Sequence, residues 1–322
     1  MREKRGIVLA GVLLLGLIAA GCIALLYGSR NRSGDGQSQK KIGAVYMTMN
    51  NPYFAVVNNQ IEAVAASRKD VVITRDSALD AEMQNRQIKE LIKENVDILL
   101  VNAIDWKSIR TGLEEARKAG IPVIAVDAEV YDSELVKAVI CSDNYEAGAA
   151  CARDLMKRKK TASILFLVQN NNKSAMDRIK GFKDTLEKAG WPYKTVDELE
   201  CQGQLEIAQP LVEQVLQKEK NIDVVMGLND PASLGAMAAL DAEDMLKQVL
   251  VYGVDGAPEA KTMIYEGKMT ATAAQSPLST GSRTAELLYR LLDGEEIPEK
   301  TVIPVTLITK DNVEAFGLAQ WQ

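Results

Sequence analysis

Two parts of the chain repeat one pattern of apolar runs. The segment NVDILLVNAID (95–105) matches NIDVVMGLND (221–230), and IPVIAVDAE (121–129) matches VLVYGVDGAP (249–258). Within each part, short runs rich in β-branched residues alternate with amphipathic stretches, which predicts alternating strands and helices. This alternation is typical of a parallel sheet with helices on both faces. We therefore expect an α/β protein with two similar doubly wound lobes.

The same reading predicts the other main elements. The expected strands are 42–47, 71–74, 96–102, 121–127, 163–169, 222–230 and 249–256, with a further strand that ends at Gln275. The expected helices are 81–95, 106–120, 175–190, 209–220 and 231–245.

In both parts an asparagine and then an aspartate stand at the ends of successive strands. Asn102 corresponds to Asn229, and Asp127 corresponds to Asp255. Open α/β sheets bind ligands at the carboxyl ends of their strands, so these four side chains are candidate ligand contacts. As an alternative, Asn and Asp are common turn residues. Asp105 and Asp230 stand where helices should open, and we expect both to be structural.

Two further carboxamides share this position. Asn51, in MTMNNPYF, lies on the predicted turn between the first strand and its helix, and Gln275 ends a strand in TATAAQSP. A neutral polyol needs fixed donors and acceptors, which Asn, Gln and Asp supply, and flat apolar surface for its C–H faces. The set of residues therefore predicts a site for a small hydroxylated molecule.

Arg178 and two aromatic residues are further candidates for this site. Arg178 lies early on a helix of the second lobe, where it could reach the cleft expected between the two lobes at the strand ends. Alternatively, it could be a surface residue paired with Asp177 or Asp184. Tyr53 and Phe54 open the first helix, as core residues or as rings that stack on a sugar.

Composition excludes several classes of function. The chain has no histidine, no GxxxxGK[ST] loop and no GxSxG elbow, so we expect neither an enzyme nor a cofactor or metal. The formal net charge is −6 and the sequence pI is about 5.1, which argues against a nucleic-acid partner. Cys141, Cys151 and Cys201 lack metal-binding spacing and are expected to be buried thiols.

The N-terminal residues 1–28 predict a membrane anchor or a lipoprotein signal. An apolar stretch follows Arg2, Lys4 and Arg5, and is long enough to span a bilayer. The small residues before Cys22 resemble a bacterial lipoprotein box, but the apolar run continues after this cysteine. An uncleaved anchor and a lipidated Cys22 both remain open. Residues 29–41 are polar and predict a flexible linker.

Several motifs together resemble the periplasmic sugar-binding proteins of the ribose-binding family, which is related to LacI-type sensor domains. The motifs are MNNPYF, ILLVNAID, IPVIAVD, ICSDNYEAGA, DRIKGF, GLNDPASLGA, YGVDGAPE and TATAAQ. The resemblance implies a type I periplasmic binding fold with a three-stranded hinge, lobe 1 at 42–142 plus 276–304 and lobe 2 at 143–275 plus 305–322. It implies ligand contacts from Asn51, Tyr53, Phe54, Asn102, Asp127, Arg178, Asn229, Asp255 and Gln275, with Ser142 beside a crossover.

Four positions depart from the family pattern. Met47 stands where a small polar residue is frequent, Ala128 where arginine is, and Gly203 and Val254 where aromatic residues are. These departures argue against ribose itself and favour a larger or less polar polyol.

The function that this resemblance implies is capture of a monosaccharide or related polyol outside the cytoplasmic membrane and its delivery to an ABC importer by hinge closure. The alternative is a membrane-tethered sugar sensor that presents its closed form to a histidine kinase or chemoreceptor. We expect a monomer in either case.

Overall fold

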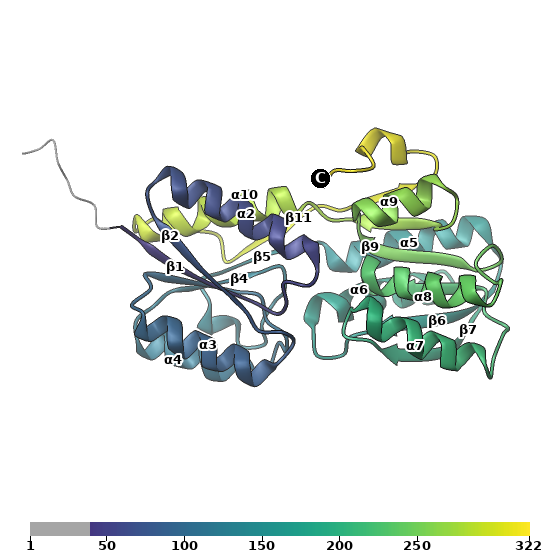
Figure 1. Ribbon diagram of the computed structural model, residues 1–322, viewed down its shortest axis with the longest axis horizontal. Helices are drawn as coiled ribbons and strands as arrows, with labels where there is room; N and C mark the ends of the chain where they lie inside the picture. Colours follow the sequence, from purple (N-terminus) through teal and green to yellow (C-terminus); the bar gives the residue numbers. More distant parts are fainter. Residues whose placement is uncertain (1–38) are drawn as a thin grey trace, which may run out of the picture. The chain divides into compact units, whose positions relative to one another are not determined.

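The structure is a computed structural model, and it describes residues 39–322 (Figure 1). The predicted anchor, the predicted linker up to residue 38 and the possible lipidation of Cys22 lie outside the described residues. Within residues 39–322, none of the helices combines the length and the apolar character that crossing a membrane requires.

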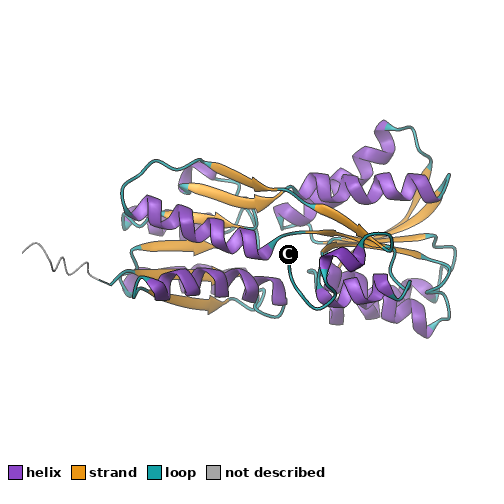
Figure 2. Ribbon diagram, turned by 90° about the horizontal axis from the view of Figure 1, so that it is seen from above, coloured by secondary structure: helices purple, strands orange, loops and turns teal. Residues whose placement is uncertain are grey.

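Residues 40–322 form two lobes, each built on a six-stranded sheet (Figures 1 and 2). Lobe 1 has the strand order β11-β5-β4-β3-β1-β2, and lobe 2 repeats this order as β12-β10-β9-β8-β6-β7. All pairs are parallel except β10 with β12, which are antiparallel. The strands of lobe 1 are β1 (Lys41–Tyr46), β2 (Val71–Asp76), β3 (Ile98–Val101), β4 (Val123–Val126), β5 (Ala138–Ser142) and β11 (Lys300–Ile303). The strands of lobe 2 are β6 (Ala162–Val168), β7 (Tyr193–Glu200), β8 (Val224–Gly227), β9 (Leu250–Asp255), β10 (Ala271–Ala274) and β12 (Thr306–Thr309).

Helices cover both faces of each sheet, as the alternating pattern predicts (Figure 2). In lobe 1, α2 packs with α10 on one face and α3 packs with α4 on the other; in lobe 2 the pairs are α5 with α6 and α7 with α8. The helices of lobe 1 are α2 (Pro52–Ser67), α3 (Ala81–Lys93), α4 (Arg110–Lys118), α10 (Pro277–Leu292) and the short 3-10 helix η1 (Ser133–Leu135). The helices of lobe 2 are α5 (Asn144–Arg158), α6 (Lys173–Lys188), α7 (Leu205–Leu216), α8 (Asp230–Ala242), α9 (Pro258–Tyr265) and the 3-10 helix η2 (Val313–Phe316).

The central strands are buried on both faces, which explains their continuous apolar sequence. Every residue of β3, β4 and β8 is buried. A strand in this position contacts helices above and below, so polar residues are excluded along its whole length. The predicted α/β class with two similar doubly wound lobes is confirmed.

Three segments connect the lobes. The chain passes from β5 into α5, from β10 into α10, and from β11 into β12. A backbone hydrogen bond of 2.9 Å from the Asp143 N–H to the Ile303 carbonyl joins two of these crossovers. The connection is therefore a three-stranded hinge, as the resemblance implies.

The predicted helix at 106–120 is shorter in the structure. It begins at Arg110, because the Asp105 carboxylate accepts hydrogen bonds from the backbone N–H groups of Lys107 and Ser108, at 2.8 and 2.9 Å, and holds the preceding residues in a turn. Aspartate competes in this way with helical hydrogen bonding. Asp105 is structural, as expected, but it fixes a turn rather than the first residue of the helix.

Two further helix starts involve proline and asparagine. The predicted helix at 209–220 begins four residues earlier, at Leu205, so Pro210 lies inside α7 rather than at its start. At α8 the cap is Asn229, whose Oδ1 accepts from the Ala232 N–H at 3.0 Å. Asp230 instead accepts from the Ala257 N–H at 2.8 Å and from the Thr272 hydroxyl at 2.7 Å, which fixes the loop after β9.

The C-terminal tail (313–322) is anchored on lobe 2 by a buried lysine. The Lys261 ammonium donates to the carbonyls of Phe316, Gly317 and Gln320 and to the Gln322 side chain, and no part of its residue is exposed to solvent. An ammonium has three N–H donors and no acceptor function, so the four oxygens around it are enough to satisfy every donor. The tail then returns to the junction of the two lobes, where Figures 1 and 2 both place the C-terminus.

Replacing this lysine should release the tail and destabilise lobe 2. For Lys261→Met we expect the free energy of unfolding to fall by about 2 kcal/mol or more, since hydrogen bonds to charged groups are worth about 1.5–3 kcal/mol and the carbonyls lose their donor. Denaturant unfolding measures this change, and faster carboxypeptidase digestion reports the released tail. The matched control is Lys268→Met, an exposed lysine paired with Glu266, which should change stability by less than about 1 kcal/mol. Equal effects of both variants would contradict the anchoring role.

Candidate functional site

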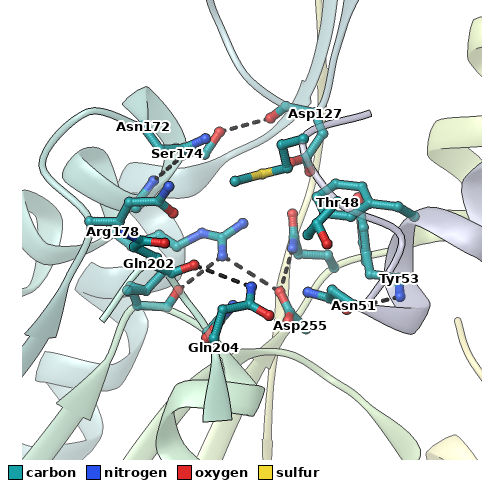
Figure 3. A pocket seen from close by; sticks show the side chains of 17 residues that line it. Thr48, Asn51, Tyr53, Asp127, Asn172, Ser174, Arg178, Gln202, Gln204 and Asp255 are labelled. Atoms are coloured by element: carbon teal, nitrogen blue, oxygen red, sulfur yellow. Dashed lines mark hydrogen bonds and ion pairs between the residues drawn. The ribbon is translucent and has the colours of Figure 1, made fainter. Parts of the chain in front are cut away.

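A polar cavity lies between the lobes at the carboxyl ends of their strands (Figure 3). The space enclosed by its walls is about 440 Å³, part of which is open to solvent. Both lobes contribute side chains, as open α/β sheets predict for a ligand site. The lining residues are Met47, Thr48, Asn51, Tyr53, Phe54, Asp127, Gln169, Asn172, Ser174, Ala175, Arg178, Gln202, Gln204, Leu228, Asn229, Asp255 and Gln275.

Most of the residues that the sequence indicated line this cavity. The structure places there Asn51, Tyr53, Phe54, Asp127, Arg178, Asn229, Asp255 and Gln275. Asn102 and Ser142 are buried beside the cavity but are not part of its lining. The convergence therefore joins residues that are more than 200 positions apart in the sequence.

Asn102 has a supporting position instead of a lining one. Its Oδ1 accepts from the Met47 N–H at 3.2 Å, and its Nδ2 donates to the Val126 carbonyl at 3.1 Å and lies 3.5 Å from Asp127 Oδ2. The side chain thus joins the ends of β1 and β4 and orients the aspartate. Ser142 ends β5, and its carbonyl accepts from Asn144 Nδ2 at 3.1 Å.

The two duplicated aspartates share an unusual backbone conformation. Asp127 has φ of 68° and Asp255 has φ of 137°. Positive φ is uncommon for a residue with a side chain, and it costs free energy unless surrounding contacts hold it. Asp127 follows β4 and Asp255 ends the equivalent strand β9, so each lobe places a residue of positive φ at this strand end, although the two φ values differ.

Among the residues that line the cavity, three buried oxygens have no hydrogen-bond partner in the described part of the chain. They are Asp127 Oδ1 from lobe 1, Asp255 Oδ2 from lobe 2 and Gln275 Oε1 from the crossover after β10. Buried acceptors are nearly always paired, and an unpaired one costs roughly 1–3 kcal/mol. The cavity therefore requires donors that the protein does not supply.

Arg178 is fixed at the cavity by partners on three elements. Its Nε donates to Asn144 Oδ1 at 2.8 Å, and its Nη1 donates to the Leu228 carbonyl at 2.9 Å. Nη1 also lies 3.5 Å from Asp255 Oδ1 (Figure 3). The guanidinium is thus preorganised, and Asp255 is held in turn by Gln275, whose Nε2 donates to Oδ1 at 2.7 Å. The alternative of a surface arginine is wrong, since Arg178 is buried.

Close packing of α5 and α6 puts Arg178 in this place. A Cβ on Gly148 would lie 1.8 Å from the Arg178 carbonyl oxygen, and one on Gly181 would lie 2.0 Å from the Tyr145 carbonyl oxygen. The two helices therefore touch backbone to backbone, and only glycine fits at either position. This contact brings the first turns of α6 close to the ends of β6 and β8.

Burial dominates the electrostatics of the acidic groups. It raises the pKa of the Asp255 carboxyl above its ordinary value; the Arg178 guanidinium opposes this shift, while Asp230 and Asp127 add to it. Burial also raises the pKa of Asp127 and of Asp230. Neutral hydrogen-bond donors would suit these carboxyl groups, whereas an anionic ligand would add repulsion.

Aromatic rings form one wall of the cavity. Tyr53 and Phe54 open α2, both are buried, and their rings meet edge to face with centroids 5.5 Å apart. The Tyr53 hydroxyl lies 3.4 Å from the Thr280 hydroxyl. Asn51, immediately before them, caps α2 by accepting from the Tyr53 N–H at 2.9 Å. The asparagine and the rings are therefore one rigid unit.

Sequence reasoning missed nine lining residues: Met47, Thr48, Gln169, Asn172, Ser174, Ala175, Gln202, Gln204 and Leu228. Gln169 directly follows β6, so its position at a strand end was the available signal. Asn172 caps α6, with Oδ1 accepting from the Ala175 N–H at 3.0 Å. Gln202 and Gln204 lie in the loop between β7 and α7, where no pattern in the sequence indicates them.

Direct contacts between the lobes surround the cavity. Asn50 Nδ2 donates to Gln204 Oε1 at 2.9 Å and to Glu206 Oε1 at 3.1 Å. On the other side, the Ser174 hydroxyl donates to the backbone carbonyl of Asp127 at 2.8 Å, and the backbone N–H of Trp106 donates to the Asn171 carbonyl at 3.0 Å. The lobes are thus closed over the cavity.

Comparison with known proteins agrees with this geometry. The sequence profile of the periplasmic binding protein domain matches residues 42–296. The ribose import binding protein RbsB of Bacillus subtilis (strain 168) is 30% identical over 271 residues, which are 84% of this chain and 87% of that protein. The protein of the same name from Escherichia coli (strain K12) is 24% identical over 280 residues, 86% of this chain and 93% of that protein.

A solved structure shares the arrangement of both lobes. It is an ABC transporter solute binding protein from Bacillus halodurans with bound myo-inositol; the TM-score is 0.81 at 25% sequence identity, and the alignment covers 88% of this chain and 99% of that chain. With the profile match over 42–296 and the 30% identity to a ribose import binding protein, this shows that the chain belongs to the periplasmic binding protein family, with the type I fold of its sugar-binding members.

Proposed function

We propose that the protein captures an uncharged monosaccharide or related polyol in the cavity between its lobes and presents the closed form to an ABC importer. The observation that carries this proposal is the set of three unpaired buried acceptors, Asp127 Oδ1, Asp255 Oδ2 and Gln275 Oε1. Hydroxyl groups donate to such oxygens and also accept, so one polyol can satisfy all three.

The other lining residues complement this ligand. The Arg178 guanidinium is a fixed donor for a ring or hydroxyl oxygen, and Nδ2 of Asn51 offers a further donor. Nδ2 of Asn229 already donates one N–H to the Gly203 carbonyl at 3.0 Å, so only its second N–H is left for a ligand. Tyr53 and Phe54 supply apolar surface for the C–H groups of a ring. Asn102 and Ser142 would act indirectly, by holding the strand ends. These roles describe binding, and none of them requires a reaction.

Closure follows from binding to both lobes. Asp127 belongs to lobe 1 and Asp255 to lobe 2, so a ligand that bonds both stabilises the closed form more than the open form. A ligand shifts a conformational equilibrium only by this difference in affinity. The three crossovers then act as the hinge.

The names of relatives favour transport. Those of RbsB from Bacillus subtilis and Escherichia coli describe ribose import, and the Bacillus halodurans protein is described as an ABC transporter solute binding protein. A sensor is the second candidate, because the fructose binding periplasmic domain of a hybrid two component system has the same fold, with a TM-score of 0.81 at 23% identity over 87% of this chain and 94% of that one. Binding to a permease, or to a kinase, by the ligand-loaded protein distinguishes the two.

The location that we propose is the outer face of the cytoplasmic membrane. The family profile that matches the chain is that of the periplasmic binding protein domain. The apolar stretch within residues 1–28 and Cys22 support tethering by either of the two routes, an uncleaved helix or a lipid. Mass spectrometry of the protein purified from membranes distinguishes the two routes, since a protein lipidated at Cys22 is cleaved before this cysteine and lacks the preceding residues.

Calorimetric titration with pentoses, hexoses, inositols and amino acids tests the binding class. We expect heat with at least one uncharged polyol and none with amino acids. Asp255→Asn should weaken binding of that polyol by roughly 10- to 100-fold, because Gln275 and Arg178 hold the amide oxygen at the Oδ1 position and the amide NH2 then replaces the unpaired acceptor Oδ2. The matched control is Asp241→Asn, on the exposed last turn of α8, which should leave affinity unchanged. Heat with an amino acid alone would overturn the sugar assignment.

Stability should depend on pH through Asp255. Because burial raises its pKa in the folded state, the folded protein binds the proton more tightly than the unfolded chain does. Stability of the ligand-free protein should therefore fall as pH rises above about 4, the ordinary pKa of aspartate. Asp255→Asn removes the titrating group and with it this loss of stability. The melting temperature of the variant at pH 7–8 should therefore exceed that of the wild type, and the two melting temperatures should converge near pH 4. A lower melting temperature for the variant at neutral pH would show that the ion pair with Arg178 outweighs burial.

A further inference from the structure

A second concavity adjoins the polar cavity at the junction of the lobes. The empty space between its walls is about 810 Å³, and it shares Asn51 and Gln204 with the polar cavity. We call it the outer groove. Its lining residues are Asn50, Asn51, Pro52, Gly203, Gln204, Leu205, Glu206, Pro231, Leu234, Ala257, Glu259 and Trp321.

The outer groove is apolar where the inner cavity is polar. Pro52, Leu205, Leu234 and Trp321 come from α2, α7, α8 and the C-terminal tail, so both lobes contribute. Leu205 is 39% exposed to solvent. Apolar residues that meet from separate elements at a concave surface are typical of a binding surface rather than of an ordinary exterior.

The Trp321 ring connects the two compartments. It meets the Tyr53 ring edge to face, with centroids 6.0 Å apart, and Tyr53 lines the inner cavity. The last residue fixes the ring in place, since Gln322 Nε2 donates to the Gly256 carbonyl at 3.1 Å and the Gln322 carbonyl accepts from the Ser276 hydroxyl at 2.7 Å. An indole held in this way offers a flat surface at low entropic cost.

Two residues, Asn51 and Gln204, line both compartments. Beside them, Asn50 Nδ2 donates to Gln204 Oε1 at 2.9 Å, and Gly203 adds no side chain to the groove. Exchanging one such bond for a bond to a ligand costs about 1 kcal/mol or less. A ligand longer than one ring would make this exchange where it extends from the cavity into the groove.

Charge restricts what the groove accepts. Glu206 and Glu259 are both exposed at its margin, and no lysine or arginine is among its lining residues. An anionic substituent would be repelled, whereas an uncharged ring could stack on the indole and contact Leu205.

We propose that the outer groove is a second subsite of the same ligand site and that the ligand is a glycoside. Its sugar ring occupies the inner cavity, and an uncharged ring joined to it by a glycosidic bond lies against Trp321 and Leu205. This inference rests on the proposed sugar-binding function and specifies its substrate class.

The experiment uses the sugar that gives the strongest heat in calorimetric titration of the wild-type protein. Its affinity is compared with those of both anomers of its methyl and phenyl glycosides and of a disaccharide that carries it at the non-reducing end. One anomer of the phenyl glycoside, or the disaccharide, should bind about 10-fold more tightly than the methyl glycoside, as burial of an aromatic ring predicts. If neither binds more tightly than the methyl glycoside, the subsite is refuted while the sugar assignment stands.

Paired leucine variants separate the groove from general effects on stability. Leu205→Ser should lower the gain in affinity from the second ring several-fold. It should leave the affinity for the free sugar unchanged. The control is Leu278→Ser, a leucine of similar exposure, 37%, in the first turn of α10 and outside the groove. It should change neither affinity. Loss of free-sugar affinity in Leu205→Ser, or an equal loss in both variants, would contradict the assignment of the groove. Absence of binding by any sugar or glycoside would refute the proposed function itself.

Discussion

Buried oxygen acceptors without protein donors are the constraint on which the cavity depends. Both sheets end at one space, and Asp127 after β4 and Asp255 at the end of β9 line it with positive φ. Strained backbone and unpaired acceptors each cost free energy, of the order of 1–3 kcal/mol. The cores of the lobes, with continuous buried strands such as β3 and β8, supply the stability that tolerates this cost.

The contacts between the lobes act in opposite directions. At the rim, Asn50 with Gln204 and Ser174 with the Asp127 carbonyl favour closure. At the centre, closure buries carboxyl groups whose pKa values burial raises. A ligand that satisfies the central acceptors therefore adds to the rim contacts, and it shifts the population toward the closed form by its differential affinity for that form. The hydrogen bond between the Trp106 N–H and the Asn171 carbonyl adds a backbone contact to the rim.

The sequence indicated the architecture well because the physical signal is strong. Strands buried on both faces must be apolar throughout, and the duplicated order of Asn and Asp at their ends survives in both lobes. The same rule placed Asn102 in the site, but its carboxamide is consumed by the Met47 N–H and the Val126 carbonyl. Periodicity cannot show which side of a turn a side chain faces. Gln204 and Trp321 lie in segments without periodicity, so only the folded chain brings them to the cavity and the groove.

The two compartments would contribute differently to specificity. In the inner cavity, a ligand that lacks one hydroxyl leaves a buried acceptor such as Gln275 Oε1 unpaired, and sites of this kind discriminate strongly. In the outer groove, contacts with Trp321 and Leu205 are apolar, and they discriminate weakly between rings of similar size. Affinity should therefore be set by the sum of both compartments, whereas the identity of the inner ring is decided by hydrogen bonds alone. A binding protein of this design would be strict about one ring and tolerant about its substituent.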